Sequence, residues 1–193
     1  GSAPHQRCRL HGNGGSSPGL VESAFEDNYA ETTLANVPQT FGGAIYNEGQ
    51  MLIKATSIHN NRARVAGGIF NRNKHIVLAN VTIARNEAQT LGGFANGSPL
   101  HTNSDFGTAS FYHVTHANNQ DQVDQQSPLF ALKSHSIYLM NSIIDGGCLN
   151  KTFYSNGHNI FGKTCATIPE PGGEQTPNPP PVSDLGLQSL TYN

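Results

Sequence analysis

Apolar residues recur at every second position in several short segments of the chain. Each segment is only three to five residues long and is bounded by Gly or Asn. Strict period-2 alternation in such short pieces predicts short β-strands separated by bends. The residues that share this spacing, and that we predict to point inward, are Met51 and Ile53, Ile76 and Leu78, Ala109 and Phe111, and Ile137 and Leu139.

The segments belong to a longer repeat. The motifs GAIYN, GGIFN and GGFAN end at Asn47, Asn71 and Asn96, and they are separated by steps of 24 and 25 residues. A second motif recurs in ATSIHNN, NVTIARN and HVTHANN. It places Ile58, Ile83 and His116 at the same position of the repeat. NSIIDGG and FEDN supply two weaker copies. A repeat of about 25 residues with several short strands predicts an all-β fold, a right-handed parallel β-helix (solenoid) of about five coils.

Asparagine recurs at two positions of this repeat. The first set is Asn47, Asn71 and Asn96, and the second is Asn28, Asn61, Asn86 and Asn119. Asn tolerates left-handed backbone at bends, and its amide can bond an equivalent Asn in the next coil. We therefore predict two asparagine ladders; the alternative is that these residues are ordinary turn asparagines.

Composition narrows the class of protein. Only 12% of the 193 residues are charged, about half the usual share, which disfavours a helical bundle. The net charge of −2 gives no electrostatic reason to expect binding to nucleic acid or to an anionic membrane. No apolar run is long enough to predict a membrane span. We predict one domain, with an N-terminal segment at 1–19, β-helix coils at 20–147, and a disulfide loop with a Pro-rich tail at 148–193.

These motifs resemble those of known exported proteins. GGAIYNEG and FEDN resemble the repeats of polymorphic outer-membrane proteins, and GGAIYNEGQMLIKATSIHNN resembles secreted bacterial β-helix proteins of the choice-of-anchor Q type. The similarity extends through the segments 141–165 and 182–190, and covers roughly residues 20–190. It implies a secreted or cell-surface location in a bacterium (periplasm or outer surface), and no particular activity. The chain departs from the pattern at His116, which replaces Ile, and at the insertion 98–107.

The segment 141–165 resembles one that closes such helices with a cysteine pair. We therefore predict a disulfide between Cys148 and Cys165, which fits an oxidising compartment, with two free thiols as the alternative. Cys8 is left over, either free or paired outside this chain.

Polysaccharide-cleaving enzymes need two or three carboxylates close together. The acidic residues of this chain fall at different positions of the repeat, and no nucleophile, phosphate-loop or zinc-protease motif occurs, so no catalytic residue is predicted.

Histidine is the residue in excess, with nine in the chain. The alignment places His75, His101 and His135 at one corner of consecutive coils, where three imidazoles could bind one copper or zinc ion, with Asp105 nearby. His113 and His116 form a competing pair around one bend. The alternatives are scattered surface histidines and, for His116, a hydrogen-bonded core histidine.

The leading functional hypothesis is an exported or surface-associated, non-enzymatic binding protein built on a β-helix, with an unknown ligand; the candidate partners are a metal ion, a glycan and a cell-surface component. A copper- or zinc-binding surface protein is the second hypothesis, and a polysaccharide-active enzyme is the third.

Overall fold

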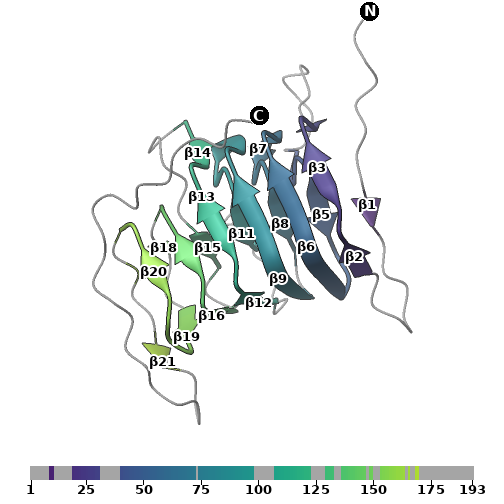
Figure 1. Cartoon of the computed structure of the whole chain (residues 1–193). Helices are drawn as coiled ribbons and strands as arrows, with labels where there is room; N and C mark the ends of the chain where they lie inside the picture. Colours follow the sequence, from purple (N-terminus) through teal and green to yellow (C-terminus); the bar gives the residue numbers. More distant parts are fainter. Residues whose placement is uncertain are drawn as a thin grey trace, which may run out of the picture.

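A computed structural model describes residues 9–10, 19–30, 40–72, 74–97, 107–122, 129–132, 136–146, 148–149, 153–163, 165 and 168–169. This part of the chain is all-β and contains no helix. Every strand pairing in it is parallel, as the repeat predicts. The strands form three sheets (Figure 1).

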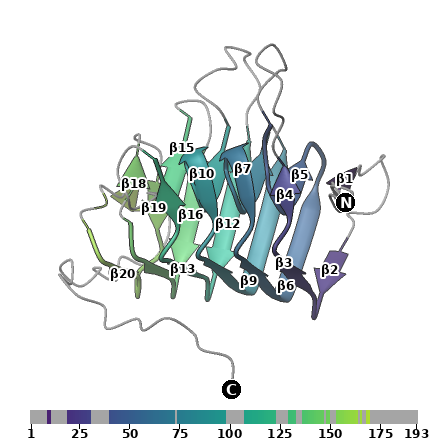
Figure 2. The same ribbon diagram turned by 90° about the horizontal axis from the view of Figure 1, so that it is seen from above.

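The largest sheet has eleven strands, and consecutive repeats lie side by side from β2 and β3 at one end to β20 and β21 at the other (Figures 1 and 2). Its two longest strands, of nine and ten residues, pair with each other over most of their length and form a continuous ladder. The strands are β2 (Gly19–Val21), β3 (Ala24–Glu26), β6 (Met51–His59), β9 (His75–Ala84), β12 (Thr108–Tyr112), β13 (Thr115–Ala117), β16 (Ser136–Met140), β17 (Ile143–Ile144), β19 (Phe153–Ser155), β20 (Ile160–Phe161) and β21 (Ile168–Pro169).

The other two sheets have six and four strands. The six-stranded sheet contains β1 (Arg9–Leu10), β5 (Ile45–Asn47), β8 (Ile69–Asn71), β11 (Phe94–Asn96), β15 (Leu129–Ala131) and β18 (Cys148–Leu149). The four-stranded sheet contains β4 (Tyr29–Ala30), β7 (Arg62–Val65), β10 (Glu87–Thr90) and β14 (Gln120–Asp121). From β5 to β11 the chain visits the six-, eleven- and four-stranded sheets in the same order twice before it returns to the first.

The predicted inward positions form the main core. Ile58, Ile83, His116 and Ile144 occupy one column across four paired strands. Ile53, Leu78, Phe111 and Leu139 occupy another, and all four are fully buried. The alternation seen in the sequence therefore correctly identified the residues that fill the space between the sheets.

Both asparagine ladders are present. The Asn47 amide donates to Asn71 Oδ1 at 2.6 Å, and Asn71 donates to Asn96 Oδ1 at 2.7 Å. In the second ladder the Asn28, Asn61 and Asn86 amides donate to the next Asn at 2.8–2.9 Å. One part of the explanation was wrong. No ladder residue has left-handed backbone. In the second ladder the left-handed residues come just before the asparagines, at Asp27, Asn60, Arg85 and Asn118, whereas the asparagines of the first ladder end strands β5, β8 and β11.

The glycine pairs allow two strands to approach closely. A Cβ on Gly67 would lie 2.2 Å from the Glu87 carbonyl oxygen, and a Cβ on Gly92 would lie 2.0 Å from that of Gln120. A side chain at either position would therefore push the four-stranded sheet away from the turn that leads into the six-stranded sheet.

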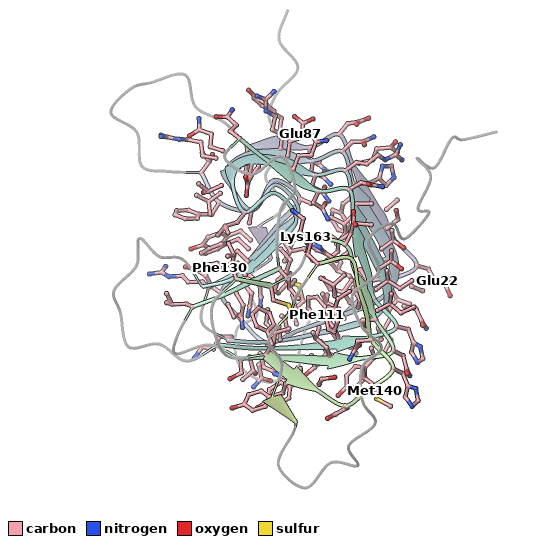
Figure 3. The ribbon with its side chains drawn as sticks, turned by 90° about the vertical axis from the view of Figure 1, so that its left-hand side faces the viewer. Glu22, Glu87, Phe111, Phe130, Met140 and Lys163 are labelled. Atoms are coloured by element: carbon pink, nitrogen blue, oxygen red, sulfur yellow. A yellow bond between two sulfur atoms is a disulfide. The ribbon has the colours of Figure 1, made fainter. Side chains whose placement is uncertain are left out.

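A second apolar cluster lies on the opposite side of the six-stranded sheet from the main core. Phe70 and Phe130 belong to it, whereas their neighbours Ile69 and Leu129 belong to the main core. Figure 3 shows this separation, with Phe111 in the centre and Phe130 at the left. The six-stranded sheet is thus apolar on both faces.

The predicted disulfide is present. Cys148 and Cys165 are bonded, with Cα atoms 4.7 Å apart and a separation of 17 positions in sequence. Both half-cystines pack against the main core, so the bridge fixes the segment at 148–165 onto the last strands. Cys8 lies outside the described residues.

We expect removal of this disulfide to lower the free energy of unfolding by about 3 kcal/mol, because the bridge restricts the unfolded chain. The measurement is urea unfolding of the Cys148→Ser/Cys165→Ser variant against the oxidised protein, after non-reducing peptide mass spectrometry has verified the linkage. Free thiols at both positions in oxidised material would contradict the bridge.

Candidate functional site

The corner predicted to hold three histidines is described only at His75. His75 is exposed at the start of β9, and its Nδ1 contacts the Thr108 hydroxyl on the paired strand β12. His101, His135 and the nearby Asp105 lie outside the described residues. The proposed three-imidazole arrangement thus remains a prediction.

The competing pair is not brought together on one surface. His113 is exposed at a bend with φ of 56°, whereas His116 is 1% exposed in the main core. The reason is the alternation along β13, which turns His116 inward into the isoleucine column. Within the described part of the chain, no group of three or more His, Cys, Asp or Glu side chains is positioned to hold a metal ion.

His116 is a buried imidazole without a hydrogen-bond partner. Both ring nitrogens are enclosed, and neither makes a hydrogen bond within the described structure. Gly93 provides the space for the ring, because a Cβ there would lie 2.2 Å from His116 Nε2. Burial lowers the pKa of His116 to about 4, so the ring is neutral at physiological pH. The prediction of a core position is confirmed, but the expected hydrogen bond is not found there.

A polar cluster that the sequence did not single out lies beside the second apolar cluster. The Tyr46 hydroxyl donates to Glu48 Oε1 at 3.0 Å, and the Arg72 guanidinium donates to the same oxygen. Burial raises the pKa of Tyr46, and the hydrogen bond to Glu48 raises it further. A phenol whose pKa is raised stays protonated at neutral pH and is a poor general base. The cluster therefore favours a structural ion pair between neighbouring repeats over acid–base catalysis.

Three tyrosines lie on the outer face of the eleven-stranded sheet. Tyr112, Tyr138 and Tyr154 come from β12, β16 and β19, which are adjacent strands. The rings of Tyr138 and Tyr154 stack with centroids 4.9 Å apart and an interplanar angle of 16°. Tyr112 is 39% exposed. We call these three residues the tyrosine surface.

The tyrosine surface is uncharged. No Asp, Glu, Lys or Arg occurs in β12, β16 or β19, whose sequences are TASFY, SIYLM and FYS. Tyrosine supplies rigid, amphipathic contact area with little side-chain entropy to lose on binding. Such a surface suits a neutral partner rich in hydroxyl groups better than an ionic polymer.

Comparison of the chain with protein-family models, with curated proteins and with solved structures found no match. In the described residues, no helix is long and apolar enough to cross a membrane. Function is therefore inferred from the side chains and their geometry.

Proposed function

We propose that this chain is an exported or cell-surface binding protein, without enzymatic activity, built on a right-handed parallel β-helix of about five coils. The repeated visit to three parallel sheets in one order supports the β-helix. The right hand follows from the strong preference of parallel crossovers for that hand. The resemblance to choice-of-anchor Q and polymorphic outer-membrane repeats is consistent with this architecture.

Export is supported by the disulfide between Cys148 and Cys165. Disulfides persist in oxidising compartments and are rare in the reducing cytosol.

The tyrosine surface carries the binding proposal. Three tyrosines on successive strands form a partly exposed, partly apolar patch, in which Tyr112 is exposed and Tyr138 and Tyr154 are half-buried, and exposed apolar patches mark interaction sites. The absence of charge on these three strands favours a neutral glycan as the partner. The glycan would contact ring edges and phenol hydroxyls, because the stacked faces of Tyr138 and Tyr154 are turned toward each other.

A glycan array followed by titration of the best ligand tests the proposal. The variant is Tyr112→Ala/Tyr138→Ser, because Ala79 and Ser110 occupy the paired positions one repeat earlier and show that the sheet accepts these residues. We expect at least a tenfold loss of affinity in the variant. Thr82→Ala, on the outer face of another part of β9, is the control and should leave affinity unchanged.

Two results would contradict this function. Equal affinity of the wild type and the tyrosine variant would remove the tyrosine surface as the binding site. Release of reducing sugar from the bound glycan would support the polysaccharide-active enzyme instead.

A further inference from the structure

One corner of the repeat presents a row of exposed or partly exposed side chains on left-handed backbone. The row contains Glu22, Ala55, Asn80, His113, Asn141 and His158, with φ between 47° and 56°. Because these residues have the same backbone conformation at equivalent positions of the repeat, their side chains point in the same direction. His158 belongs to the row because Ile160 pairs with Ile143, which places His158 opposite Asn141 despite one extra residue in its repeat.

Two imidazoles and a thioether come from three successive repeats at this corner. The His113 N–H donates to the Met140 carbonyl at 3.1 Å, so the two residues are direct neighbours on adjacent strands. The Asn141 N–H donates to the Gly157 carbonyl at 3.3 Å, which places His158 beside the segment that contains Met140. His113 and His158 are two repeat steps apart, about 10 Å between backbones. The register places Asn141 between them, and Met140 is the residue just before Asn141.

All three side chains are accessible. His113 and His158 are exposed and Met140 is partly exposed. Figure 3 shows Met140 on the outside of the sheet, on the far side from the core around Phe111. Among the described residues, neither imidazole makes a side-chain hydrogen bond or an ion pair. The ring nitrogens and the sulfur are therefore available to a ligand.

We propose that His113, Met140 and His158 form a surface site for a soft monovalent metal ion, Cu(I). Thioether ligands select Cu(I), and imidazole binds copper well, so a two-histidine, one-methionine set matches this ion better than zinc or calcium. Metal–nitrogen bonds of about 2 Å let two rings that lean toward each other bind one ion across the intervening repeat. Of the histidines predicted from the sequence as metal ligands, only His113 belongs to this site. The site does not depend on the proposed glycan binding.

Methyl NMR of protein labelled at the methionine methyl groups tests the site. The chain contains two methionines, Met51 and Met140, and the first is 2% exposed in the core. Ag(I) is the probe, because it shares the soft-ligand preference of Cu(I) and needs no reductant that would open the disulfide. A Cys8→Ser background removes the remaining thiol. We expect one equivalent of Ag(I) to shift the Met140 methyl resonance and to leave Met51 unchanged.

His113→Asn/His158→Asn is the matched variant, because Asn80 and Asn141 already occupy this corner in other repeats. We expect it to weaken Ag(I) binding at least tenfold, and Met140→Leu to weaken it as well. Asn80→Ala, at the same corner one repeat before His113, should leave the affinity unchanged, and Ala55 shows that this corner accepts alanine. An unshifted Met140 resonance overturns the site, as does equal affinity of the double-histidine variant. Stoichiometric Zn(II) binding in preference to Ag(I) would also overturn it.

Discussion

Replacing Ile83 with aspartate is expected to unfold the protein. Ile83 is 0% exposed and stacks between Ile58 and His116 in the main core. A carboxylate there loses its hydration without gaining a partner, which costs at least about 4 kcal/mol. This is a large fraction of the roughly 5–15 kcal/mol that stabilises a domain. Far-UV circular dichroism during thermal unfolding measures the effect.

Thr82→Asp is the matched control, because Thr82 is the preceding residue of the same strand and points to the other face. It introduces the same side chain into the same strand but leaves the charge in water. We expect it to lower stability by no more than about 1 kcal/mol. Similar losses in the two variants would show that the register of β9 is wrong.

Acidification is expected to destabilise the protein through His116. The pKa of this residue is lowered from 6.5 to about 4 by burial, so the unfolded chain takes up a proton at a higher pH than the folded chain. The stability is fully present above pH about 6.5 and falls as the pH decreases toward 4, where the loss is complete. The difference between the two pKa values corresponds to about 3 kcal/mol.

His116→Ile isolates this contribution from that of other titrating groups. Isoleucine occupies the same column at 58, 83 and 144, so the substitution fits the core pattern. In urea unfolding, we expect the stability of the variant relative to the wild type to increase by about 3 kcal/mol between pH 7 and pH 4. A difference that stays constant over this range would mean that His116 is protonated equally in the folded and unfolded states.

The sequence was most informative where one physical requirement recurs in every repeat. Ile58 and Ile83 recur because each repeat must fill the same core position, and Asn61 and Asn86 recur because each amide bonds the next. Both features therefore appear as a period in the sequence. The Gly-Gly motifs recur because a Cβ at Gly67 or Gly92 would collide with the backbone of Glu87 or Gln120 in the neighbouring repeat.

The candidate metal site could not be predicted in this way, because its side chains do not recur from one repeat to the next. His113 and His116 are three residues apart, yet one is exposed and the other buried. His158 was missed because its repeat has one extra residue, which shifts the simple alignment. The period of about 25 residues predicted where the chain bends. It could not show which residues at these bends have side chains on the same face of the sheet.

The sequence by itself determined the all-β class, the parallel register, the two asparagine ladders and the column in which His116 lies, because each follows from alternation and period. Only the tertiary structure decided that Phe70 and Phe130 form a second apolar cluster on the other side of the six-stranded sheet. It also decided that Tyr46, Glu48 and Arg72 share hydrogen bonds and that His113, Met140 and His158 lie at one corner. These groupings depend on how far each bend turns the chain, and bend geometry is a property of the packed repeats rather than of any one segment.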